Sequence, residues 1–174
     1  MDQFRFRTRA PLRPHVLSTR NFEPLYNVAC TLRTFRIVQD RHPEATLTLV
    51  GAGSEDQHLR ELAGELRLEH VRFVGRVPPD EIWRYYDEAD IYLQTPDIDN
   101  MPLSVLEAFA SGCAVVSTNA GGVPAILTNE KHGLLVRDAV RYRFERGVGV
   151  GHADVFGLGA RQLETLDLPR FAGG

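Results

Sequence analysis

The chain has 174 residues, 43% of them hydrophobic, which is enough for one domain with a core of its own. The net charge is −3 and the pI about 6.1, so the charge balance gives no reason to expect a nucleic-acid partner. Neither a signal peptide nor an apolar run of transmembrane length stands out, so we expect a cytoplasmic protein without a transmembrane segment. Cys30 and Cys113 lack metal-ligand spacing and are expected to be small core residues.

Residues 1–14 carry several arginines and prolines but no pattern of core residues. The arginines are Arg5, Arg7, Arg9 and Arg13. Such a composition is typical of a linker, so we expect an interdomain linker-like arm whose arginines lie in solvent.

From residue 15 onward, short apolar runs alternate with segments of helical periodicity. Strands are expected at residues 15–19, 46–50, 71–74, 91–93, 113–117 and 134–136. Helices are expected around Leu25, Val28, Leu32, Phe35 and Val38; around Leu59, Leu62, Ala63 and Leu66; from Pro79 through Ile82, Trp83 and Tyr86; and around Leu103, Leu106 and Ala110. This alternation implies right-handed crossovers, so the predicted fold class is α/β, with a Rossmann-like doubly wound parallel sheet over residues 15–137. If the strands lie in the order 3-2-1-4-5-6, the loops at residues 20–27 and 95–103 meet at one edge of the sheet, where ligands bind.

The most informative stretch runs from residue 94 to residue 112, which we expect to form a strand end, a turn and a short helix that stops at Gly112. Asp99 and Glu107 flank the turn with seven residues between them, and two carboxylates there suit the acceptance of hydrogen bonds from sugar hydroxyls. This spacing, followed by Ala108, Ala110 and the run 112–116, resembles the E-x7-E signature of the retaining GT-B glycosyltransferases of the GT4 family. The resemblance covers roughly residues 15–137.

The resemblance implies the C-terminal, donor-binding half of a GT-B fold, with a nucleotide-diphosphate sugar as donor substrate, no further cofactor and no metal. In that family the acid at the position of Glu107 holds the ribose, the acid at Asp99 contacts the transferred sugar, and an arginine at Arg20 binds phosphate. These three are the expected catalytic residues. The expected donor-binding residues are Gly51, Gly53, Val77, Asn100, Met101, Leu103, Ser104 and Glu107. The acceptor site would belong to an N-terminal domain missing from this chain, so we expect little or no activity from the chain alone.

Several features depart from the family pattern or allow other interpretations. Asp99 is one methylene shorter than the usual Glu, Pro102 has no amide hydrogen to donate, and Leu25 and Tyr26 occupy the region of a usual phosphate-binding lysine. Glu107 also fits a capping box that begins at Ser104. Asp97 and Asp99 form a D-x-D pattern that ligates a metal in another glycosyltransferase fold. The alternative functions are a non-catalytic nucleotide-sugar-binding or assembly module and a fragment of a Rossmann-type dehydrogenase; two glycines, Gly51 and Gly53, are weak support for the latter.

The pattern stops after Arg137. Residues 138–174 mix arginine, valine and many glycines where the family has long helices. We expect an atypical, poorly ordered tail that arose by truncation or a frame shift of the gene.

Overall fold

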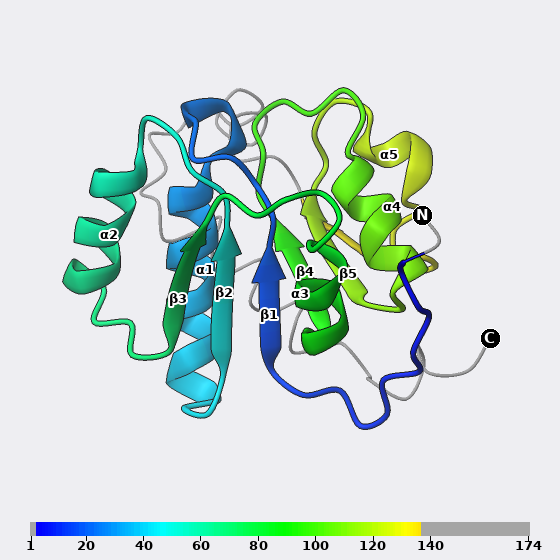
Figure 1. Ribbon diagram of the computed structural model, residues 1–174, viewed down its shortest axis with the longest axis horizontal. Helices are drawn as coiled ribbons and strands as arrows, with labels where there is room; N and C mark the ends of the chain where they lie inside the picture. The colour runs from blue at the N-terminus through cyan, green and yellow to red at the C-terminus, as the bar shows by residue number, and fades with distance from the viewer. Residues whose placement is uncertain (1–2, 137–174) are drawn as a thin grey trace.

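The computed structural model describes residues 3–136, which form one parallel β-sheet with helices on both faces (Figure 1). The strands are β1 (His15–Ser18), β2 (Thr46–Val50), β3 (Val71–Gly75), β4 (Ile91–Gln94), β5 (Ala114–Thr118) and β6 (Leu134–Val136). They lie in the order β3-β2-β1-β4-β5-β6, and every neighbouring pair is parallel. The predicted fold class, the six strands and their order are confirmed.

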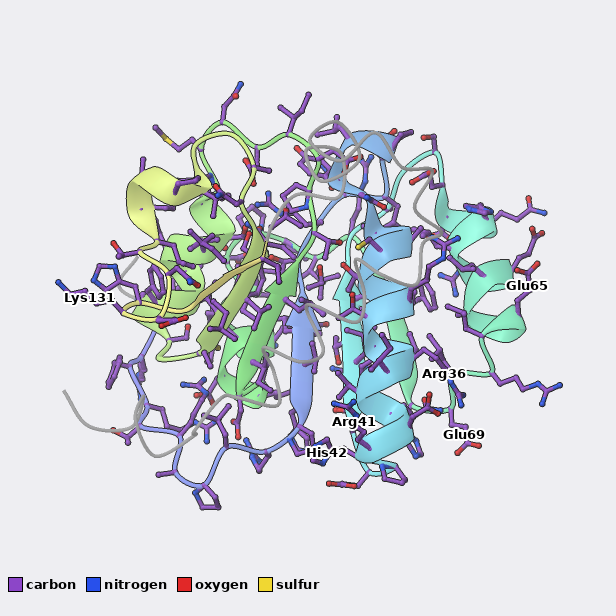
Figure 2. All side chains as sticks on the ribbon, turned by 180° about the vertical axis from the view of Figure 1, so that it is seen from behind. Arg36, Arg41, His42, Glu65, Glu69 and Lys131 are labelled. Atoms are coloured by element: carbon purple, nitrogen blue, oxygen red, sulfur yellow. The ribbon has the colours of Figure 1, made fainter. Side chains whose placement is uncertain are left out.

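The helices are distributed over the two faces of the sheet. They are α1 (Val28–Arg41), α2 (Asp56–Glu65), α3 (Trp83–Glu88), α4 (Leu103–Ala110) and α5 (Val123–Ile126), with a short 3-10 turn, η1 (Pro24–Tyr26), before α1. Figure 1 shows α3, α4 and α5 on one face, and Figure 2, from behind, shows α1 crossing the other with α2 beside it. Because successive side chains of a strand point to opposite faces, Val16 packs in the α1 core and Leu17 in the α3–α4 core.

Three helical predictions are wrong in detail. The third helix begins at Trp83 instead of Pro79, because residues 79–82 form turns in which the Glu81 amide donates to the Pro78 carbonyl (3.0 Å). Leu25 lies in η1 and is 44% exposed, so it adds nothing to the apolar face of α1. In α4 the buried residues are Ser104, Val105 and Ala108, whereas Leu103, the first residue of the helix, is 56% exposed.

The expectation that the arginines of the arm lie in solvent is confirmed for Arg5, which is exposed, but it is wrong for Arg9. Arg9 is buried, and Arg7 and Arg13 form ion pairs with the buried carboxylate of Asp90 (3.1 and 2.8 Å). The arm is therefore attached to the domain through these arginines, and in Figure 1 it runs down past α4 and then along the edge where the strands begin.

Two further predictions concern single residues. Gly112 follows the end of α4 with φ +74°, the left-handed conformation expected of it. Cys30 and Cys113 are free, buried thiols in the core, as predicted, and burial raises the pKa of each to about 11.

No helix within residues 3–136 is long and apolar enough to cross a membrane. The prediction of a poorly ordered tail at residues 138–174 lies outside the described residues.

Candidate functional site

The loops that follow β1 and β4 are joined to each other at the carboxyl edge of the sheet. The Asp97 amide donates to the Leu25 carbonyl (3.0 Å), and the Asn27 side-chain amide donates to the Asp97 carboxylate (3.0 Å). Thr95 Oγ1 donates to the Asn27 carbonyl (2.9 Å), while Asn27, in a left-handed conformation (φ +46°), caps α1 through the Cys30 amide. The meeting of these two loops at the point where the strand order reverses is confirmed.

Arg20 and Asp99 lie in direct contact at this edge. Arg20 Nη2 forms an ion pair with Asp99 Oδ2, and both side chains are nearly buried, at 11% and 8% exposed. Arg20 Nε also donates to Gln94 Oε1 (2.8 Å), and the guanidinium lies 5.2 Å from the centre of the Tyr26 ring. The shorter side chain of Asp99 thus reaches a partner within the chain, and the charge of Arg20 is already neutralised in this state.

Glu107 accepts a hydrogen bond from Tyr86. The distance from Tyr86 Oη to Glu107 Oε2 is 2.9 Å, and the same hydroxyl lies 3.2 Å from the Ser104 carbonyl. Burial raises the pKa of Tyr86 well above its ordinary value, and the neighbouring Tyr92 and Glu107 raise it further, so the phenol keeps the proton that it donates. The capping-box interpretation of Glu107 is wrong, because Ser104 lies inside α4 instead of at its N-cap. The N-cap is Pro102, which makes no side-chain capping bond to the first turn of the helix.

A chain of hydroxyl groups connects Glu107 to Arg20 across β1 and β4. Thr19 Oγ1 lies 2.8 Å from Tyr86 Oη and 3.3 Å from Tyr92 Oη, and Tyr92 Oη donates to Gln94 Oε1 (3.3 Å). The three predicted catalytic residues therefore belong to one polar network. The connecting residues were not predicted as site residues: Thr19, Tyr86, Tyr92 and Gln94. The sequence did contain a signal for them. Thr19 directly follows β1, Tyr92 and Gln94 lie in the neighbouring β4, and Tyr86 lies on the buried face of α3, the helix before β4.

The loop that carries Asp99 is held by the turn before α5. The Gly122 amide donates to the Asp99 carbonyl (2.7 Å). A Cβ on Gly121 would lie 2.2 Å from the same carbonyl oxygen, and one on Gly122 would lie 2.2 Å from that of Asn100. The glycine pair is needed for this close approach, so the turn fixes the height of Asp99 above the sheet.

Gly51 and Gly53 make room for the chain itself. A Cβ on Gly51 would lie 2.1 Å from the Arg20 carbonyl, and one on Gly53 would lie 2.3 Å from the Phe22 carbonyl. Glycine at both positions therefore permits the close approach of the loop after β1, and contact of Gly51 and Gly53 with a donor stays a prediction. The Gly51 amide donates to the Gly75 carbonyl (2.9 Å), and the half-buried Val77 follows two residues later. Gly51, Gly53 and Val77 therefore all lie near the carboxyl edge of the sheet.

The donor-binding residues predicted around α4 have different surroundings. The side chains of Asn100 and Met101 are exposed, that of Met101 to 75%. The Leu103 amide already donates a hydrogen bond to the Met101 carbonyl (2.9 Å). Ser104 is buried, and its hydroxyl points to Gln94 (3.4 Å). Contact of these residues with a donor stays a prediction.

The two acids of the D-x-D pattern bind protein groups: Asp97 accepts from Asn27, and Asp99 pairs with Arg20. Within residues 3–136 no group of three or more His, Cys, Asp or Glu side chains is arranged to hold a metal ion. The only lysine in the sequence, Lys131, is an exposed residue near the β6 side of the molecule, at the far end from α2 in Figure 2. It does not replace the lysine that the resemblance places after β1.

The strand order identifies the fold. A parallel sheet whose order reverses between β1 and β4 is the fold of the C-terminal half of GT-B glycosyltransferases. Residues 2–143 match the family model described as "Glycosyl transferases group 1", and the chain belongs to that family.

Relatives in sequence agree with this family, and solved structures agree with the fold. The D-inositol 3-phosphate glycosyltransferase of Corynebacterium jeikeium is 37% identical over 113 residues, which are 60% of this chain and 27% of the relative. The pneumococcal O-GlcNAc transferase GtfA, solved with UDP and GlcNAc, superposes with a TM-score of 0.75 at 15% identity over 97% of this chain and 33% of that one. The C-terminal domain of a group 1 protein (LpcC) from Francisella tularensis has a TM-score of 0.65 at 21% identity, over 90% and 87% of the two chains. The chain thus spans about a third of the length of the curated relatives that it matches.

Proposed function

We propose that this chain binds a nucleotide-diphosphate sugar at the edge formed by the loops after β1 and β4, as the donor half of a retaining, GT4-like glycosyltransferase. The observation that carries the proposal is the network that joins Arg20, Asp99 and Glu107. Tyr86 takes one acceptor position of the Glu107 carboxylate, and an ionised carboxylate has others for the two hydroxyls of a ribose.

Arg20 is the cation proposed to stabilise the departing diphosphate. A guanidinium suits this task because its planar donors match phosphate oxygens. Its present partner is Asp99, so the diphosphate would have to share the guanidinium with that carboxylate or displace it. In the retaining mechanism implied by the resemblance no protein nucleophile is needed, and the protein positions the donor and stabilises charge.

The base of the donor is left open by the relatives. Structures similar to this chain hold UDP, as in GtfA and in HepE from Anabaena, whereas a relative from Mycobacterium tuberculosis is named as GDP-mannose-dependent. The proposal is tested by calorimetric titration of the full chain with UDP, GDP and ADP, each alone and as a sugar conjugate. Saturable binding of one base, weakened in Glu107→Gln, is expected; no binding of any of the six would contradict the proposal.

An N-terminal acceptor domain is the proposed partner. Leu25, Ile98, Met101 and Leu103 are large apolar side chains that are 44–75% exposed on the two loops of the site. Apolar groups gathered around a polar site are typical of a surface that another domain or a substrate covers. We expect little transfer by the chain alone and restored transfer when an acceptor domain of a group 1 relative is co-expressed; transfer by the chain alone would contradict the dependence.

A second candidate is a non-catalytic nucleotide-sugar-binding module. The ion pair that occupies Arg20 and the internal use of the Leu103 amide favour it, because both remove donors from a diphosphate. Slow hydrolysis of a bound nucleotide sugar, in which water takes the place of the acceptor and no acceptor domain is needed, separates the candidates. The enzyme half is expected to release sugar to water, and a binding module is not.

A further inference from the structure

Arg9 of the arm is buried against the domain, although it belongs to a segment with the composition of a linker. Its side chain is 2% exposed. Nε donates to the Ala89 carbonyl (2.7 Å), Nη2 donates to the Tyr86 carbonyl (2.8 Å), and Nη1 donates to the carbonyls of Ser111 and, at 2.8 Å, Arg7. The guanidinium therefore uses most of its donors on backbone carbonyls.

Three of these carbonyls belong to the ends of two helices. Tyr86 lies in the last turn of α3, Ala89 is the C-cap of α3, and Ser111 is the C-cap of α4. The last carbonyls of a helix have no partner within it and carry partial negative charge, so a cation that binds them stabilises the end. One guanidinium thus joins α3 to α4, and a lysine could not span both because its ammonium is a single point.

The two helices that Arg9 joins carry the two members of the Glu107 contact. The Tyr86 backbone carbonyl is held by Arg9, and its hydroxyl donates to Glu107 Oε2. On α4 the Ser111 amide donates to the Glu107 carbonyl (3.0 Å), and the Ser111 carbonyl accepts from Arg9. Phe4, also in the arm, packs edge-on against the Tyr86 ring with centroids 5.6 Å apart. Both routes from Arg9 end at Glu107.

We propose that Arg9 is a positioning residue for the donor site: from the arm, it fixes α3 against α4 and thereby sets the place of the Glu107 carboxylate for the donor ribose. The effect on ribose binding rests on the proposed function. The hold on α4, by which we mean that Arg9 fixes the end of α4 against α3, does not. The arm is then part of the donor site's framework, and a change in its seating would be transmitted to Glu107.

The test compares Arg9→Lys with Arg13→Gln in the full chain. Arg13 also binds Asp90 (2.8 Å), but its side chain is 46% exposed. Among residues 3–136 it bonds only to Asp90 and the Glu88 carbonyl, so it has no bond to α4. We expect Arg9→Lys to raise the Kd of the tightest-binding nucleoside diphosphate about fivefold and Arg13→Gln less than about twofold. An unchanged Kd in Arg9→Lys, or an equal loss of affinity in both variants, overturns the proposal.

A double-mutant cycle separates positioning from general loosening. In a Glu107→Gln background, Arg9→Lys should add less than about twofold, because its effect passes through the carboxylate already removed. A full fivefold loss in that background overturns the proposal. Tyr86→Phe leaves Arg9 in place and removes only the hydroxyl, so it should also raise the Kd about fivefold; unchanged affinity in this variant contradicts the route through Tyr86 even if Arg9→Lys fails to fold.

Amide hydrogen exchange without ligand distinguishes this proposal from the proposed function. Arg9→Lys should exchange about tenfold faster at residues 107–111 and not in α1, with no such change in Arg13→Gln. If no nucleotide binds but exchange accelerates in this pattern, the proposed function fails while the hold on α4 stands. Unchanged exchange at residues 107–111 contradicts that hold.

Discussion

Two arginine–aspartate clusters lie at opposite ends of β4, and they differ in how completely the arginine charge is used. Before the strand, Asp90 is 1% exposed and is approached by Arg7, Arg9 and Arg13 at 3.1, 3.5 and 2.8 Å. After the strand, Asp99 is 8% exposed and meets Arg20, which also bonds Gln94.

The difference teaches which cluster is structural and which is suited to a ligand. At Asp90 several cations and two helix ends share a closed set of bonds, so an entering anion would have to break many of them. At Asp99, one aspartate is the acidic partner that residues 3–136 give to Arg20, beside an exposed loop, and a phosphate could replace that one carboxylate. The first cluster fixes the arm on the domain, and the second is proposed to exchange its partner during donor binding.

The largest effect is expected from Asp90→Asn. The change leaves the nearly buried guanidinium of Arg9 without a neutralising charge, and removal of one partner of a buried pair costs about 3 kcal/mol. Urea denaturation at pH 7 measures the free energy of unfolding. Glu88→Gln, which removes only the exposed pair with Arg72, is the control and should cost less than about 1 kcal/mol. A loss at Asp90 no larger than at Glu88 would show that the first cluster is not structural.

The same carboxylate predicts an acid-dependent part of the stability. Burial by itself raises the pKa of Asp90, but hydrogen bonds from the Arg13 side chain and amide, with the charges of Arg13 and Arg7, outweigh it and lower the pKa below the ordinary value. The unfolded chain then binds the proton more readily, so this stability is complete above the unfolded pKa of about 3.9 and is lost as the pH falls through the folded pKa. Urea titrations from pH 6 downward should show the advantage of the wild type over Asp90→Asn shrink only below about pH 4. An advantage that is constant with pH would contradict this assignment.

At the other end of β4, Glu107→Gln should weaken nucleotide binding without unfolding the chain. Glutamine can still accept from Tyr86 but loses the charge that strengthens hydrogen bonds to ribose hydroxyls. We expect the Kd to rise about tenfold, which is about 1.4 kcal/mol, by calorimetry. The free energy of unfolding should change by less than about 1 kcal/mol. A large loss of stability with unchanged Kd would assign Glu107 to the structural group.

The smallest effect is expected from Asp99→Asn. This variant tests the difference between the two clusters most directly, because it asks whether Arg20 can exchange its acidic partner for a phosphate. Removal of the carboxylate charge leaves Arg20 free to bind an anion, so the affinity for a nucleoside diphosphate should rise about threefold. The extra affinity contributed by an attached sugar should fall, because the predicted sugar acceptor is weakened. Asp40→Asn, in an exposed pair with Arg36 on α1, is the control and should change neither. Weaker binding of the diphosphate in Asp99→Asn would mean that Asp99 positions Arg20 instead of competing for it.

The sheet could be predicted because its information is local. Apolar alternation and strand-ending glycines specify β2 or β3 within a few residues, and the strand order is the common one for a doubly wound parallel sheet. The arm could not be predicted, because Arg9 is buried by carbonyls about eighty to one hundred residues away along the chain. Such long-range pairing leaves no periodic signal in the sequence.

The site divides in the same way. Arg20, Asp99 and Glu107 could be named from spacing and resemblance, and the topology predicted that their loops meet. The bonds among them could not be foreseen. That Asp99 would satisfy Arg20, and that Tyr86 instead of a helix amide would hold Glu107, depends on side-chain reach across β1 and β4.

The central claim is that the carboxyl edge of the sheet at β1 and β4 binds a nucleotide-diphosphate sugar. NMR tests it most directly, by following the backbone amide chemical shifts of the full, isotope-labelled chain as the tightest-binding nucleoside diphosphate is added. We predict that the saturating shifts gather at residues 19–27, 51–54, 75–77 and 95–107. Shifts that gather instead around the Asp90 cluster, or that follow the surface charge without saturation, would contradict the account.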